Sequence, residues 1–114
     1  MIYVIADDLT GANDTGVQFS KQGYSTQVAI LSDTQSQHLA STLSQEALDV
    51  LVIDTETRDA DAAAARARIR AVLASLYLQP GDIVYKKIDS TLRGQIGVEL
   101  DECLRLLRKA SPRN

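Results

Sequence analysis

Short apolar, mostly β-branched runs alternate with amphipathic stretches along this chain, and this alternation constrains its fold more than any other feature. Each run is too short for a typical helix and contains few polar side chains, which is the pattern of a buried strand. The predicted strands are 2–6, 26–31, 50–53 and 83–85.

Helices are predicted between these strands. The clearest covers 60–78, where apolar residues recur at helical spacing. The others are predicted from the cap and turn residues near 10–14 to Gln22, over 34–48 with a weaker pattern, and from about Gly94 onwards. The resulting order, βαβαβαβα, is typical of a parallel sheet with helices on both faces. We therefore expect an α/β fold: a three-layer, Rossmann-like domain with a mostly parallel sheet.

Composition excludes several classes of protein. The 114-residue chain has a formal net charge of -3, which argues against a general nucleic-acid binder. No apolar run approaches a membrane span and no secretory signal opens the chain, so we expect a cytoplasmic protein. The single cysteine, Cys103, excludes an internal disulfide, and the single histidine, His38, excludes a Ser-His-Asp site within the chain.

Polar clusters follow three of the predicted strands, and parallel strands bring such ends to one edge of a sheet. The clusters are 7–11, 54–58 and 86–94. Adjacent carboxylates such as Asp7 and Asp8 can position a hydroxyl, act as a base or bind Mg²⁺. We therefore expect a crevice that combines carboxylates, cations and hydroxyls.

Each of these features also has a purely structural interpretation. Asp7, Asp8 or Thr10 could simply cap the first helix. Arg58 alone is typical of a surface charge, and strand alternation sends Lys86 and Lys87 to opposite faces. Helical spacing also places residues of the predicted helices. Arg66 and Arg70 are expected on the solvent side of the helix over 60–78. The apolar residues of the last helix are expected on one buried stripe: Ile96, Leu100, Cys103, Leu104 and Leu107.

The segment 89–94 has the chemistry of an anion-binding loop. Ser90 or Thr91 can cap the last helix, whose free N–H groups attract anions, and Arg93 adds a planar donor fork. Gly94 and Gly97 permit close approach of backbone or ligand. Neither a Walker A motif nor a GxGxxG motif occurs, so a dinucleotide site is unsupported.

Three blocks together resemble the N-terminal sugar-binding domain of the four-carbon acid sugar kinase family, in particular D-threonate and D-erythronate kinases. The blocks are 5–16, 54–58 and 85–97, in the family's order. The resemblance implies ATP-dependent phosphorylation of tetronates or 3-oxo-tetronates at the terminal hydroxyl. It also implies residue roles: Asp8 as the base and a hydroxyl ligand, Arg93 near anionic charge, and a substrate site of Arg58, Lys87, Asp89, Ser90 and Thr91. Gln95 stands where the family usually has Asn.

The same resemblance implies a division of labour. Residues 1–110 would form the N-terminal part of an acid-sugar-binding domain, an incomplete one, with 111–114 as a loose tail. ATP and Mg²⁺ would bind mainly to a C-terminal nucleotide domain absent from this chain, so the chain alone should not be a competent kinase. We expect no metal- or cofactor-binding residues here, no nucleic-acid or membrane partner, and a possible homo-oligomer. The alternatives are a stand-alone binding module for a small hydroxy acid, and a non-catalytic remnant.

Overall fold

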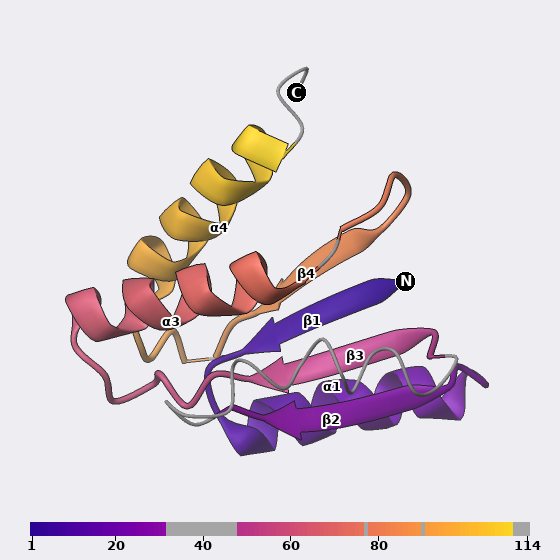
Figure 1. Cartoon of the computed structure of the whole chain (residues 1–114). Helices are drawn as coiled ribbons and strands as arrows, with labels where there is room; N and C mark the ends of the chain where they lie inside the picture. Colours follow the sequence, from indigo (N-terminus) through magenta and orange to yellow (C-terminus); the bar gives the residue numbers. More distant parts are fainter. Residues whose placement is uncertain (32–47, 77, 90, 111–114) are drawn as a thin grey trace.

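The computed structural model describes residues 1–31, 48–76, 78–89 and 91–110. Its four strands form one sheet in the order β2-β3-β1-β4, and every neighbouring pair is parallel (Figure 1). The elements are β1 (Ile2–Ala6), α1 (Leu9–Lys21), β2 (Thr26–Ile30), β3 (Val50–Asp54), α3 (Ala62–Ser75), β4 (Ile83–Lys87) and α4 (Ile96–Ala110). The helix predicted over 34–48, apart from Leu48, and the predicted tail at 111–114 lie outside the described residues.

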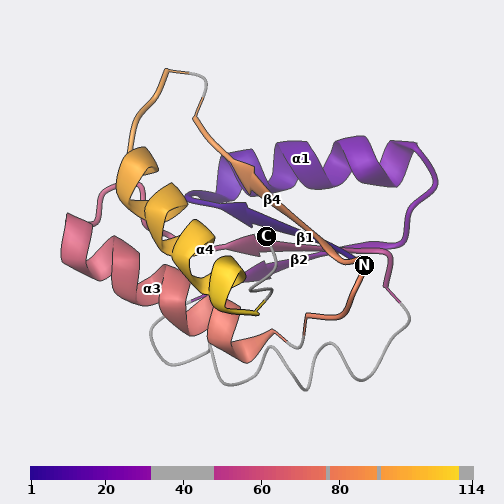
Figure 2. The same ribbon diagram turned by 90° about the horizontal axis from the view of Figure 1, so that it is seen from above.

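The sheet is covered on both faces, by α1 on one side and by α3 and α4 on the other (Figure 2). Strand alternation divides β1 between the two layers. Tyr3 and Ile5 enter the core beneath α3 and α4, whereas Val4 and Ala6 pack in the core beneath α1. The three-layer α/β architecture predicted from the sequence is therefore confirmed, with a sheet that is entirely parallel among the described strands.

Side-chain caps set where two of the helices begin. Asp8, not Thr10, caps α1: its Oδ1 accepts the Gly11 N–H at 2.9 Å. Asp61 does the same for α3, and extended backbone at Leu76 ends that helix earlier than the predicted 60–78. None of the helices in the described part of the chain is long and apolar enough to cross a membrane.

Two arginines of α3 that were expected in solvent form ion pairs instead. Arg66 and Arg70 reach across to carboxylates of α4. Arg66 lies 2.8 Å from Asp101, and Arg70 lies 3.3 Å from Glu102.

The predicted apolar stripe of α4 is partly wrong for the same reason. Glu99 and Glu102 are buried beside Cys103, while Leu100 and Leu104 are exposed. The helix turns its carboxylates inward because cations on α3 and β4 lie there to receive them.

Strand β4 lies at the edge of the described sheet and pairs only with β1 there. Its residues alternate between the two layers: Val84 packs against the core under α3 and α4, whereas Ile83 and Tyr85 face the α1 side. Helix α1 leaves that side of β4 uncovered, so Ile83 is 57% exposed and Tyr85 is 47% exposed.

This layering predicts unequal costs for two matched substitutions. Ile53→Ala removes a fully buried side chain of β3 and should lower the free energy of unfolding by about 2–5 kcal/mol. Ile83→Ala, on the exposed side of β4, should change it by less than about 1 kcal/mol. Urea unfolding measures both; equal losses would contradict the assigned layers.

Candidate functional site

The carboxyl ends of β1, β3 and β4 meet at one edge of the sheet. Ala6 is in register with Asp54 on one side and with Lys87 on the other, so the three strands end level with one another. The loops that follow carry the polar clusters singled out in the sequence. The expectation that these clusters converge is thus confirmed by the strand register.

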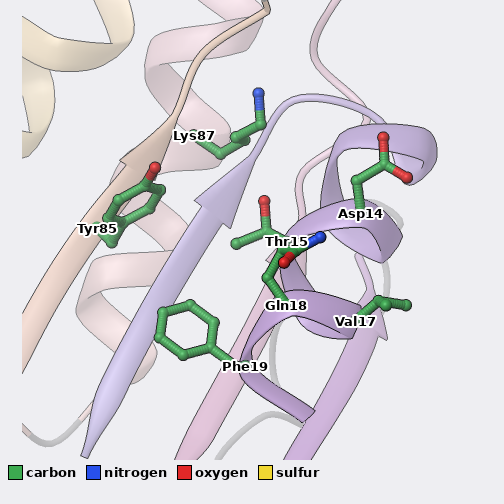
Figure 3. A pocket seen from close by; sticks show the side chains of 7 residues that line it. All are labelled: Asp14, Thr15, Val17, Gln18, Phe19, Tyr85 and Lys87. Atoms are coloured by element: carbon green, nitrogen blue, oxygen red, sulfur yellow. The ribbon is translucent and has the colours of Figure 1, made fainter. Parts of the chain in front are cut away.

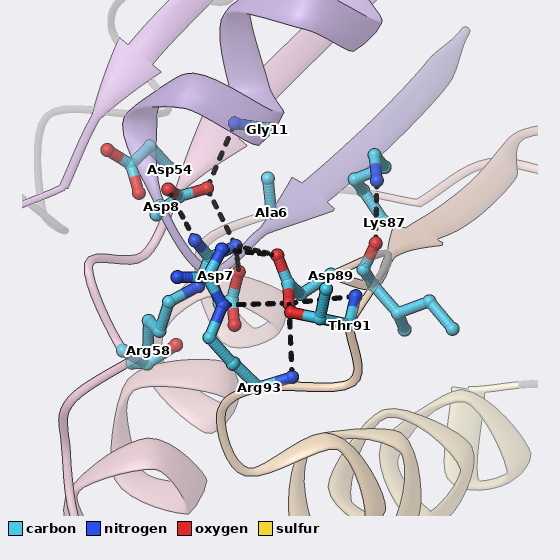
Figure 4. A network of polar contacts seen from close by, with 12 residues as sticks. Ala6, Asp7, Asp8, Gly11, Asp54, Arg58, Lys87, Asp89, Thr91 and Arg93 are labelled. Carbon is cyan, nitrogen blue, oxygen red and sulfur yellow. Dashed lines mark hydrogen bonds and ion pairs between the residues drawn. The ribbon is translucent and has the colours of Figure 1, made fainter.

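Arg58 is the centre of this edge (Figure 4). Its guanidinium donates two hydrogen bonds to Asp8, from one terminal nitrogen to Oδ2 at 2.8 Å and from the other to Oδ1 at 3.0 Å. The second nitrogen also donates to Asp7 Oδ1 at 3.1 Å and lies 3.2 Å from Asp89 Oδ1. One cation from the β3 loop therefore joins carboxylates that follow β1 and β4.

Asp89 is held still further by its own loop. Arg93 forms a bidentate pair with it, Nε to Oδ2 at 2.9 Å and a terminal nitrogen to Oδ1 at 3.0 Å. The Thr91 hydroxyl and backbone N–H also donate to Oδ2. The Arg93 and Thr91 hydrogen bonds hold the pKa of Asp89 well below its usual range.

The predicted capping role of Thr91 is therefore wrong. Its hydroxyl is committed to Asp89, and α4 begins only at Ile96. Residues 92–95 lie between Thr91 and the start of α4, so Thr91 cannot reach the first turn of the helix as a cap. Ser90, the other predicted cap, lies outside the described residues.

A cleft of about 810 Å³ opens over these groups. Carboxylates and guanidinium groups together make its wall: Asp7, Asp8, Glu56, Arg58, Asp59, Ala60, Arg68, Arg93 and Gly94. Arg68 donates to the carbonyl oxygens of Thr55 and Glu56, and so supports the β3 loop from below. The cleft can therefore offer both hydrogen-bond donors with positive charge and carboxylate acceptors to a small polar ligand.

Gly94 allows the 89–94 loop to lie close to Asp7 on the cleft wall. Its φ of 89° lies in the left-handed region, and an added Cβ would lie 2.5 Å from Asp7 Oδ2. Only a residue without a side chain allows the 89–94 loop to approach Asp7 this closely.

Lys87 does not line this cleft, although its side chain lies near Asp8: a Cβ at Gly11 would lie 3.0 Å from Asp8 Oδ1 and 3.8 Å from Lys87 Cγ. Asp8, Arg58, Asp89, Thr91 and Arg93 come together, whereas Lys87 lines a second pocket, of about 560 Å³, between α1 and β4 (Figure 3). That pocket is lined by Asp14, Thr15, Val17, Gln18, Phe19, Tyr85 and Lys87. The predicted alternation explains this, since Lys86 faces α4 and Lys87 faces the α1 side.

The resemblance to the kinase family implies no role for Asp54. It is fully buried at the end of β3; its Oδ1 accepts the Glu56 N–H, and its Oδ2 has no hydrogen-bond partner among the described residues. Burial raises the pKa of Asp54 to about 7, and the nearby carboxylates of Glu56 and Asp8 act in the same direction. A carboxylate that ends an otherwise apolar buried strand was the signal available in the sequence.

The described residues contain no group of three or more His, Cys, Asp or Glu side chains placed to hold a metal ion. The carboxylates of Asp7, Asp8 and Asp89 converge on a guanidinium instead. This donor set suits an organic ion with hydroxyl groups better than a bare divalent cation.

Comparison with known proteins identifies the family. A family model described as the sugar-binding N-terminal domain matches residues 2–111. This chain belongs to that family. The resemblance drawn from the three sequence blocks is therefore confirmed.

Curated relatives of this sugar-binding domain include named kinases. The chain is 44% identical over 103 residues to a D-threonate kinase of Salmonella typhimurium, covering 90% of this chain and 22% of the kinase. It is 38% identical over 113 residues to a D-erythronate kinase of Heliobacterium modesticaldum, covering 93% of this chain and 23% of the kinase. The chain thus spans less than a quarter of the length of these two relatives.

Solved structures support the same fold. A crystal structure of a domain of unknown function from Bordetella bronchiseptica, with bound citrate and as a domain-swapped dimer, superposes with a TM-score of 0.75 at 35% identity. The match covers 92% of this chain and 25% of that one. A second crystal form of that protein gives a TM-score of 0.67 at 33% identity.

The contact between Gly94 and Asp7 predicts a difference between two glycines. Gly94→Ala and Gly81→Ala both place a side chain at positive φ, which costs about 1–2 kcal/mol. Only Gly94→Ala also pushes against Asp7, because nothing lies within 4 Å of a Cβ at Gly81. Gly94→Ala should lower the free energy of unfolding further, as measured by urea unfolding. Equal losses would contradict the close approach.

Asp54 predicts a pH dependence. Its pKa is raised to about 7 in the folded protein, whereas an ordinary value of 3.8 holds when it is solvated. Between these values the folded state binds one more proton than the unfolded state, so stability falls as pH rises from about 4 to about 7. Asp54→Asn should remove this component. Urea unfolding from pH 4 to pH 8 compares the two proteins, and parallel pH profiles would contradict the assignment.

Proposed function

We propose that this chain forms the acceptor-binding part of an ATP-dependent kinase that phosphorylates four-carbon acid sugars at the terminal hydroxyl. D-threonate and D-erythronate are the proposed substrates, with 3-oxo-tetronates as a third candidate. One observation carries the proposal: guanidinium groups and carboxylates from three strand ends converge on one cleft, in a domain whose relatives are D-threonate and D-erythronate kinases.

A tetronate presents a carboxylate and three hydroxyl groups, and the cleft offers partners for both. Arg93 uses its Nε and one terminal nitrogen on Asp89, which leaves its other terminal nitrogen for a ligand carboxylate. Its side chain is 63% exposed, so a ligand can reach it. Arg58 is compensated by three acids of the protein, so its proposed role is to orient Asp8 and to add a secondary contact.

Asp8 is the proposed base. Its Oδ1 accepts from both Gly11 and Arg58, whereas its Oδ2 accepts only from Arg58 among the described residues. Oδ2 therefore keeps a lone pair that can accept a hydrogen bond, and then the proton, from a ligand hydroxyl. The guanidinium fixes the direction of that lone pair before the ligand arrives, which lowers the cost of orienting the acceptor.

ATP and Mg²⁺ are assigned to polypeptide beyond this chain. Phosphoryl transfer depends on groups that position a triphosphate and its metal, whereas Asp7, Asp8 and Asp89 are already paired with Arg58 or Arg93. The remaining predicted contacts, Lys87 and Ser90, stay predictions. Lys87 would have to approach the cleft from the α1 side.

The second candidate is a stand-alone module that binds a small hydroxy acid without phosphorylating it. The citrate bound to the Bordetella bronchiseptica structure favours this class of ligand. Both candidates use the same cleft, and phosphoryl transfer separates them. The kinase proposal predicts turnover only when this chain is combined with the nucleotide-binding part of a relative, whereas the binding-module proposal predicts none.

Calorimetric titration with D-threonate and D-erythronate tests the cleft. Asp8→Asn and Arg93→Gln should each weaken binding by roughly tenfold to a hundredfold, because each removes a charged hydrogen-bond partner. Asp101→Asn on the outer side of α4 is the matched control and should bind like the wild type. Unchanged affinity in both cleft variants would remove this site assignment.

A further inference from the structure

A buried polar cluster lies beneath the cleft, on the side of the sheet that α3 and α4 cover. Thr57 Oγ1 donates to Glu99 Oε2 at 2.9 Å, and Lys86 Nζ lies 3.3 Å from Glu99 Oε1. Thr55 Oγ1 lies 2.7 Å from Thr57 Oγ1 and 3.1 Å from the carbonyl oxygen of Ala6. Glu99 is 1% exposed and Lys86 is 8% exposed, so these charges are nearly sealed from water.

Two members of this cluster are chain neighbours of charged cleft residues. Ala6 is followed directly by Asp7, and Thr57 is followed directly by Arg58. The backbone repeats the connection, because Thr57 N–H and Arg58 N–H both donate to the carbonyl oxygen of Asp7. The cluster therefore ties the end of β1 to the loop after β3.

Two further members, Lys86 and Glu99, lie on either side of the third loop. Lys86 is in β4 and Glu99 is in the first turn of α4, so their contact closes the segment 88–95 at its base. That segment carries Asp89 and Arg93. Since Glu99 also receives the Thr57 hydroxyl, one carboxylate fixes this loop relative to the loop that carries Arg58.

Stability alone does not explain such a cluster. Removing two charges from water is costly, and a buried ion pair is often no more stabilising than apolar side chains of similar volume. The contact between Lys86 and Glu99 also lacks a directed bond: Glu99 Oε1 has no hydrogen-bond partner among the described residues, and Lys86 Nζ donates to the Lys87 carbonyl oxygen. The cluster instead connects the ends of the three loops that follow β1, β3 and β4, where it can determine the spacing between them.

We infer that Glu99 is a positioning residue: through Thr57 and Lys86 it sets the separation of Arg58 from the Asp89–Arg93 pair, and so the shape of the acid-sugar cleft. The inference rests on the proposed function for the identity of the ligand. It does not rest on that function for the geometry of the loops, which can be measured without a ligand.

The test is a compensated double variant, Lys86→Met/Glu99→Leu, which removes both charges together and leaves neither buried alone. We expect its urea unfolding midpoint to stay close to that of the wild type. We expect its Kd for whichever of D-threonate and D-erythronate the wild type binds to rise roughly tenfold or more, because the cleft residues lose their spacing. The Nε–Hε NMR signals of Arg58 and Arg93 should move in the free protein.

Glu102→Gln is the matched control. Glu102 is equally buried on the same helix, but its partners are Arg66 and Arg70 of α3 and Arg105 of α4 itself. It should lower stability while leaving the Kd and both arginine signals unchanged. Thr57→Val, of nearly the same shape as the native residue, gives the same readouts if the double variant fails to fold, and should shift the arginine signals.

A double variant with wild-type stability, Kd and arginine signals would overturn the inference. If the wild type binds neither acid sugar, the proposed function fails and the arginine signals decide alone. Signals that move in Lys86→Met/Glu99→Leu but not in Glu102→Gln support the positioning role. Signals that stay in place in the double variant, or in Thr57→Val, refute it.

Discussion

The contact of one guanidinium with three carboxylates organises this domain. Arg58 is largely buried, and a charge removed from water must be compensated nearby. Its partners are Asp7 and Asp8 after β1 and Asp89 after β4, so the compensation holds only when three strands end level and three loops turn inward. Three carboxylates carry more negative charge than Arg58 can neutralise alone, and Arg93 forms a second ion pair with Asp89. The same interaction thus closes the sheet edge and builds the cleft above it.

A cleft assembled in this way is oriented before a ligand arrives. Arg58 fixes Asp8, Asp89 fixes Arg93, and Gly94 brings the loops close enough for these pairs to form. Ordering such side chains only on binding would cost affinity. Asp54 does not belong to these pairs. Its buried Oδ2 has no hydrogen-bond partner among the described residues that would offset the cost of its burial.

Much of this fold follows from local pattern. β-Branched apolar runs such as 50–53 are typical of buried strands, and Asp8 is one of the residues before α1 that can cap a helix. The convergence of the polar clusters follows from parallel strands alone. Periodicity does not report the partners of a helix, so it could not show that Glu99 and Glu102 turn inward to meet cations from other elements while Leu100 and Leu104 face outward. The sequence also permits Thr91 as a cap of α4, whereas in the structure its hydroxyl donates to the nearby carboxylate of Asp89.

We propose that the cleft at the ends of β1, β3 and β4 binds a four-carbon acid sugar. NMR titration of the chain with D-threonate and D-erythronate, observing backbone amides and arginine Nε–Hε groups together, shows where such a ligand binds. Binding in the cleft predicts saturable shifts at Arg58, Arg93, Gly94 and Gly11. Shifts confined to the second pocket, at Phe19 and Tyr85, or no saturable shift with either acid sugar, would contradict it.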